Sequence, residues 1–150
     1  MTDAHEPREL LARYHQAMID FDADALAELY APDCVHEFGF LTPGHAPSYR
    51  SREEVRTAYR AAWRSPGVRL LEIHNLAVHE TADPAVVVAE WAATGRLPDR
   101  GEIGLNGVLV LRAQGGQLTH VRDYMDVLGL AHRTGRLPSL AAALAESEAR

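Results

Sequence analysis

A strand-like stretch near the C-terminus places one carboxylate, Asp123, where the protein interior is expected. Gly115 and Gly116 precede the stretch and are typical of a hairpin turn, which favours a β-strand after them. Because side chains alternate between the two faces of a strand, Asp123 shares a face with Val121 and Met125. An unpaired buried charge is costly, and carboxyls with a perturbed pKa cluster at active sites. The spacing therefore predicts an inward acid or base, with a structural ion pair as the alternative.

Two further polar side chains are expected to face the same interior. The segment Cys34–Phe40 alternates with one mostly apolar face, which carries His36. Tyr14 lies on the apolar stripe of a predicted first helix. His36 could donate to Asp123, orient a substrate carbonyl, act as the partner acid or base, or be a satisfied core residue. Tyr14 could present its hydroxyl to a substrate or serve packing alone. Asp123, His36 and Tyr14 are therefore the candidate catalytic residues.

The lining of a substrate pocket is expected to be mostly aromatic. Tyr59 and Trp63 share the apolar stripe of a later helix and should shape the cavity. Asn106 is a further candidate, although it precedes Gly107 and a turn or bulge would also explain it. The candidate substrate-binding residues are Phe38, Tyr59, Trp63, Trp91 and Asn106. We find no histidine spacing typical of a metal site and no nucleotide fingerprint, so we expect neither a metal nor a cofactor.

Length and composition fit one globular domain, residues 1–150. The chain is 47% hydrophobic and 24% charged, with a formal net charge of −6. This charge, without a basic stripe, argues against nucleic-acid binding. Cys34 is the single cysteine, which excludes an internal disulfide and fits a reducing compartment. The first residues lack signal-peptide features and no apolar run would span a bilayer, so we expect a cytoplasmic protein without a membrane partner.

The elements that must position these residues follow an α+β order. Two helices come first, and the second has Asp22 as its N-cap, includes Tyr30 and is stopped by Pro32. The strand 34–40 follows, and then a helix that opens with the capping box 51–54.

The rest of the chain is mostly β-structure, and its consecutive strands should pair antiparallel. The strands are predicted for residues 68–78, 85–94, 101–112 and 118–125. A short helix capped by Asp126 follows. Residues 138–150 form a peripheral C-terminal tail, either a surface helix or frayed.

This order of elements resembles the NTF2-like superfamily of α+β cone folds. The most specific part is the run Val121-Arg122-Asp123-Tyr124-Met125-Asp126 after the glycine hairpin. A second part is Tyr14 followed by Leu29-Tyr30-Ala31-Pro32-Asp33 and a strand. The chain looks most like the SnoaL-like polyketide cyclases, the ketosteroid isomerase relatives and the limonene epoxide hydrolases. The resemblance implies helices packed on a strongly curved, mainly antiparallel sheet that encloses a pocket.

Position by position, the resemblance favours the cyclase chemistry. Asp123 falls where the SnoaL-like cyclases carry a catalytic aspartate, and Tyr14 where ketosteroid isomerase has an oxyanion-hole tyrosine. Phe38 replaces the general base of that isomerase, and Trp91 replaces an arginine that limonene epoxide hydrolase needs. Asn106, allowing for a longer hairpin, would match the second oxyanion donor of the isomerase.

The leading hypothesis is a cofactor-independent acid/base enzyme that cyclises, isomerises or dehydrates a small, apolar, polyketide-like carbonyl substrate. One alternative is a non-catalytic module that binds a small molecule. Another is epoxide opening by Asp123 alone or with His36. We also expect a homodimer, because apolar residues on the outer sheet face often mark an interface. Those residues are Leu71, Ile73, Val86 and Val88.

Overall fold

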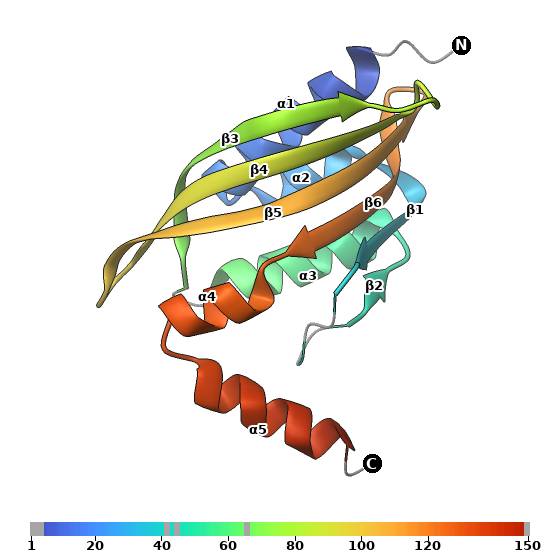
Figure 1. The fold of residues 1–150 in the computed structure, drawn as a ribbon. Helices are drawn as coiled ribbons and strands as arrows, with labels where there is room; N and C mark the ends of the chain where they lie inside the picture. Colours follow the sequence, from blue (N-terminus) through green and yellow to red (C-terminus); the bar gives the residue numbers. More distant parts are fainter. Residues whose placement is uncertain (1–4, 41–42, 44–45, 65–66, 149–150) are drawn as a thin grey trace.

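The computed structural model describes residues 5–40, 43, 46–64 and 67–148, and the helices of the N-terminal half pack on one curved sheet (Figure 1). In chain order the elements are α1 (His5–Asp20), α2 (Ala23–Glu28), β1 (Tyr30–Phe38), β2 (Ser48–Tyr49), α3 (Arg52–Arg64), β3 (Arg69–Glu80), β4 (Val86–Leu97), β5 (Gly101–Gln114), β6 (Gln117–Met125), α4 (Val127–Arg133) and α5 (Leu137–Glu148). The α+β class predicted from the sequence is confirmed.

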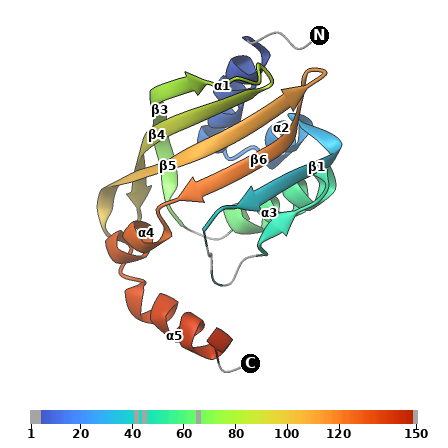
Figure 2. The same ribbon diagram turned by 45° about the vertical axis from the view of Figure 1, so that its right-hand side comes forward.

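The sheet has the strand order β2-β1-β6-β5-β4-β3. Neighbouring strands pair antiparallel except for β1 and β6, which run parallel. The long strands bend together, and α1, α2 and α3 lie on the concave side (Figures 1 and 2). The β5–β6 hairpin turns at Gly115 and Gly116, whose φ values of 60° and 76° suit a two-residue turn. The parallel pair sets the inward faces of β1 and β6 side by side.

The helices on the concave side begin where their capping residues predict. Asp22 caps α2 by accepting a hydrogen bond from the backbone N–H of Ala25 at 2.9 Å. At the start of α3, Ser51 Oγ accepts from the N–H of Glu54 at 3.1 Å. The Glu54 carboxylate in turn accepts from the N–H of Arg50 at 2.7 Å.

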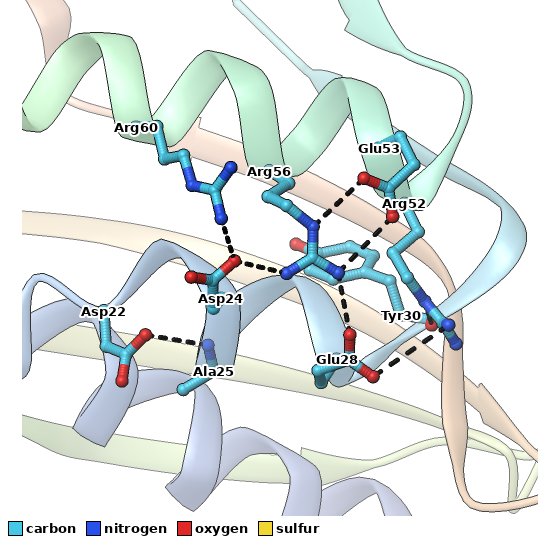
Figure 3. A network of polar contacts seen from close by, with 9 residues as sticks. All are labelled: Asp22, Asp24, Ala25, Glu28, Tyr30, Arg52, Glu53, Arg56 and Arg60. Atoms are coloured by element: carbon cyan, nitrogen blue, oxygen red, sulfur yellow. Dashed lines mark hydrogen bonds and ion pairs between the residues drawn. The ribbon is translucent and has the colours of Figure 1, made fainter.

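Charged side chains join α2 to α3 (Figure 3). Arg56 of α3 donates to Asp24 and to Glu28 of α2, the latter at 2.7 Å. It also pairs with Glu53 at 3.1 Å, and Arg60 reaches Asp24 as well. Arg56 is the centre of this group, because it alone has three acidic partners among the residues drawn. The contacts fix α3 beside α2, behind the strand that carries His36.

One boundary differs from the sequence-based expectation. The helix α2 ends at Glu28, so Tyr30 and Pro32 belong to β1 and not to a helix and its end. Tyr30 pairs with Leu118 of β6, which shows that strand pairing overrides local helix propensity here. Pro32 is tolerated because it lies within a register shift of β1, where a missing N–H breaks no regular ladder.

Two further segments, the end of the strand predicted for residues 34–40 and the C-terminal tail, take a definite form in the structure. Phe40 lies beyond β1, is 62% exposed and packs its ring edge-on against Tyr124 with centroids 5.3 Å apart. The C-terminal tail forms α5, which buries none of its described side chains and lies apart from the sheet (Figures 1 and 2). Within the described ranges, no helix is long and apolar enough to cross a membrane.

Candidate active site

The strands β1 and β6 bring Asp123 and His36 to the same inner face of the sheet. In their parallel register Phe38 lies beside Asp123, and His36 lies beside Val121. On the other side of β6, Asp123 is opposite Leu109, which is 3% exposed. Asp123 therefore faces the interior. This agrees with the sequence-based prediction, in which side-chain alternation places Asp123 on the same face as Val121.

The carboxyl group of Asp123 is enclosed without a hydrogen-bond partner. The residue keeps some exposure overall, but its Oδ1 is closed off from solvent and no described residue donates to it. Burial raises the pKa of Asp123 to about 7, because the charged form loses its hydration. Near neutral pH the carboxyl is thus a mixture of acid and carboxylate, which suits it to give and take a proton.

Three tyrosine side chains surround the same space. Burial raises the pKa of Tyr14, Tyr30 and Tyr59 well above the usual value, and the nearby Asp123 raises it further. The Tyr14 hydroxyl lies near those of Tyr30 and Tyr59. It is buried and makes no hydrogen bond of ordinary geometry with a described residue. Tyr14 therefore presents a buried hydroxyl near the Asp123 carboxyl, which itself has no donor among the described residues.

His36 pairs with Tyr30 and not with Asp123. Its Nδ1 lies 2.8 Å from the Tyr30 hydroxyl, while its Nε2 is buried and has no partner among the described residues. Burial lowers the pKa of His36 to about 4, so the ring is neutral near pH 7. The possibility that His36 donates to Asp123 is thus not what the structure shows. His36 instead offers an unpaired Nε2 to the interior.

Aromatic rings close the space around His36. Phe38, Tyr49 and Tyr59 lie with ring centroids 5.1, 5.8 and 6.1 Å from the imidazole. Trp63 continues this wall, with its centroid 5.1 Å from that of Tyr59. The predicted lining residues Phe38, Tyr59 and Trp63 are thus brought together.

The other two predicted lining residues have different positions. Trp91 faces inward across Gly107, and its buried indole Nε1–H has no partner among the described residues. Asn106 is exposed and lies on the outer face of β5, so its assignment to the inner pocket is wrong. The physical reason is alternation, because Leu105 and Leu109 face inward and the residue after Leu105 must face outward.

A cavity of about 820 Å³ opens between the end of α3, the β4–β5 turn and the helices α4 and α5. Its lining includes Trp63 and Met125. Met125 follows Asp123 by two residues on the same face of β6. Asp123 is therefore the next inward-facing residue of β6 after this part of the cavity lining. The lining itself does not include Asp123.

The fold is that of the NTF2-like superfamily of α+β cones. The chain belongs to the SnoaL-like domain family, whose model matches residues 11–121. An uncharacterized PhzA/B-like protein of Pseudomonas aeruginosa is 26% identical to it over 122 residues, which cover 81% of this chain and 84% of that protein.

Solved structures share the fold at low sequence identity. A proposed isomerase from Bacillus subtilis superposes with a TM-score of 0.80 at 20% identity, covering 91% of this chain and 97% of that one. A proposed polyketide cyclase from Xanthomonas campestris pv. campestris superposes with a TM-score of 0.70 at 22% identity, covering 88% of this chain and 99% of that one. Identities this low establish the fold and leave the chemistry to the site.

Sequence reasoning missed the role of Tyr30. Its assignment to a helix hid the fact that it shares the inner face of β1 with Cys34 and His36. Alternation gave no usable signal, because a register shift between Tyr30 and Val35 interrupts β1 and the strand conformation of Tyr30 depends on its pairing with Leu118. Tyr49 of the short strand β2, opposite His36, was missed because two residues carry no periodicity.

Proposed function

We propose that the protein is a cofactor-independent acid/base enzyme that acts on a small, mostly apolar carbonyl substrate. The observation that carries the proposal is the buried Asp123 carboxyl, whose Oδ1 has no partner among the described residues and whose pKa is raised to about 7. A buried polar atom without a partner costs about 1–3 kcal/mol. Such a cost is understandable where a ligand supplies the missing contact.

The proposed reaction begins with enolisation. Asp123 as carboxylate takes a proton from the carbon next to the substrate carbonyl, and the electron pair moves onto the carbonyl oxygen. The Tyr14 hydroxyl donates a hydrogen bond to that oxygen and stabilises the enolate. If the Tyr30 hydroxyl donates to His36 Nδ1, the Nε2–H of the neutral His36 is a second donor.

The enolate then has three outcomes. Return of the proton from Asp123 to another carbon is isomerisation. Attack of the enolate carbon on a second carbonyl of the substrate, which takes up the proton, is cyclisation. Loss of a β-hydroxyl as water, with the proton of Asp123, is dehydration. The apolar walls would exclude bulk water from the enolate in each case.

A binding module without catalysis is the second candidate. The observation in its favour is that the lining of the open cavity ends at Trp63 and Met125 and does not include Asp123. In that case the cavity would hold a ligand that never reaches the carboxyl.

Hydrogen–deuterium exchange separates the two candidates. A panel of cyclic and polyketide-like ketones is incubated with the protein in D₂O, and exchange at the carbon next to the carbonyl is followed by NMR. Catalysed exchange by wild type that is lost in Asp123→Asn supports the enzyme. Ketones that bind, as measured by calorimetry, without any accelerated exchange would instead support the binding module.

A further inference from the structure

Two arginines stand at the rim of the open cavity. Arg100 belongs to the β4–β5 turn and Arg136 to the α4–α5 turn, and both line the cavity. Within the described part of the chain, no carboxylate lies within 4.0 Å of either guanidinium. Asp99 is the one acidic residue in the lining, and it pairs with neither. The rim is therefore positive in a chain whose net charge is −6.

The Arg100 guanidinium contacts a glycine of the α4–α5 turn. Gly135 has φ +71°, and a Cβ placed on it would lie 2.8 Å from the Arg100 Cζ. The guanidinium thus rests against the backbone of the α4–α5 turn, directly before Arg136. Two arginines from distant parts of the sequence thus line the same rim, where a bound anion would balance their like charges.

The first turn of α5 adds to the same rim. Ser139 and Leu140 line the cavity, and α5 begins at Leu137. Backbone N–H groups in the first turn of a helix lack intrahelical acceptors and carry the positive end of the helix dipole. In α5, Pro138 has no N–H and the Leu140 N–H donates to the Arg136 carbonyl at 2.9 Å, which leaves the Ser139 N–H as the first-turn donor beside the two guanidinium groups.

Apolar side chains also line the cavity. Its walls include Trp63, Leu97, Met125 and Leu130. Met125 lines the cavity and lies two residues after Asp123, on the same face of β6. A lining of this kind suits a molecule with an anionic group at the rim and an apolar body.

We propose that the substrate is a keto acid whose carboxylate is held by Arg100 and Arg136, with its carbonyl end directed toward Asp123. Guanidinium groups bind carboxylates through paired, charge-assisted hydrogen bonds, which matches the planar anion of a carboxylic acid. The carbonyl half of this inference rests on the proposed function, whereas the carboxylate half rests only on the rim.

Matched probes test the carboxylate half by binding alone. The affinities of β-benzoylpropionate and of its methyl ester are measured by calorimetry for wild type, for Arg100→Gln/Arg136→Gln, and for Arg13→Gln. Arg13 is an exposed residue of α1 outside the cavity lining, so it controls for loss of positive charge.

Wild type should bind the acid about tenfold more tightly than the ester, because only the acid makes charge-assisted hydrogen bonds. The double variant should bind both alike, with its affinity for the ester unchanged. Arg13→Gln should keep the preference. Equal affinities in wild type, a preference that survives in the double variant, or no binding of either probe at millimolar concentration would overturn the inference.

The outcome is independent of catalysis. Asp123→Asn should keep the preference for the acid, since the rim is intact. If ketone exchange fails but the preference is seen, the proposed reaction is wrong and the anion site stands. If exchange is seen without the preference, the anion site alone is wrong.

Discussion

At the scale of single residues, the interior holds more hydrogen-bonding capacity than it uses. Asp123 Oδ1, Tyr14 Oη, His36 Nε2 and Trp91 Nε1 are all buried without a partner among the described residues. Desolvation acts in opposite directions on the two titratable groups of neighbouring strands, raising the pKa of Asp123 to about 7 and lowering that of His36 to about 4. Both groups are thus driven toward their neutral forms, which suits proton transfer in a dry site.

The raised pKa of Asp123 should appear in the pH dependence of stability. A carboxyl whose pKa rises from 3.8 to about 7 on folding holds its proton more tightly in the folded state. Its stabilising contribution is complete below about pH 4 and is lost as the pH rises toward 7. The lowered pKa of His36 and of His15, both about 4, gives the opposite slope between about pH 4 and 6.5.

Comparison of wild type with Asp123→Asn isolates the contribution of the carboxyl to the pH dependence of stability, because both proteins contain the same histidines. At about 1.4 kcal/mol per pH unit, the variant should gain roughly 2–3 kcal/mol in unfolding free energy relative to wild type between about pH 5 and pH 8. Urea denaturation at the two pH values measures this change. A stability difference that is the same at both would mean that Asp123 has an ordinary pKa.

His36→Gln should slow the reaction less than Asp123→Asn does. His36 is neutral and bonds Tyr30, so its loss removes a hydrogen-bond donor and leaves the base in place. The pH midpoint of the rate should not move, because no hydrogen bond couples His36 to Asp123. Rate–pH profiles of ketone exchange test this, and a greater loss in His36→Gln would make His36 the base.

At the scale of elements, the sequence predicted the features that depend on local patterns, namely the inward faces of strands and the starts of helices. Alternation placed Asp123 and His36 on inward faces, and the capping residues Asp22 and Ser51 marked helix starts. Tyr30 could not be placed in this way, because its strand conformation depends on pairing with Leu118, which lies far away in the sequence. The same limit hid the pairing of His36 with Tyr30.

The join between α2 and α3 provides a test at this scale (Figure 3). Arg56→Ala removes the residue that bonds Asp24, Glu28 and Glu53, and it should lower the melting temperature by a few degrees. Arg60→Ala, which removes only the pairing with Asp24, should lower it less. Because the acidic partners are more than half exposed, the effect should shrink in about 1 M salt. Calorimetry at low and high salt measures both variants, and equal effects would contradict the central role of Arg56.

At the scale of the whole molecule, we propose a homodimer formed through the outer face of the sheet. Leu71 is 37% exposed there, and Val86 and Val88 are partly exposed. Ile73, which the sequence predicted for this face, pairs with the buried Ala93 and therefore faces inward. Leu76, 66% exposed, lines a groove of about 600 Å³ beside them. Apolar patches of this kind often mark interfaces, and two-fold symmetry is the usual arrangement.

Light scattering at micromolar concentration should give the mass of two chains. Leu76→Glu should shift the protein to a monomer without unfolding it, because the side chain is exposed in the single chain. A wild-type monomer would contradict the proposed assembly.

The central claim is that Asp123 moves the proton. The most direct measurement is the turnover number for ketone exchange by wild type and by Asp123→Asn, with the affinity for the same ketone measured in parallel. Because a positioned acid or base contributes about 10²–10⁴-fold, the variant should lose a factor in that range while it binds the ketone as well as wild type does. Equal turnover numbers in the two proteins would contradict the account.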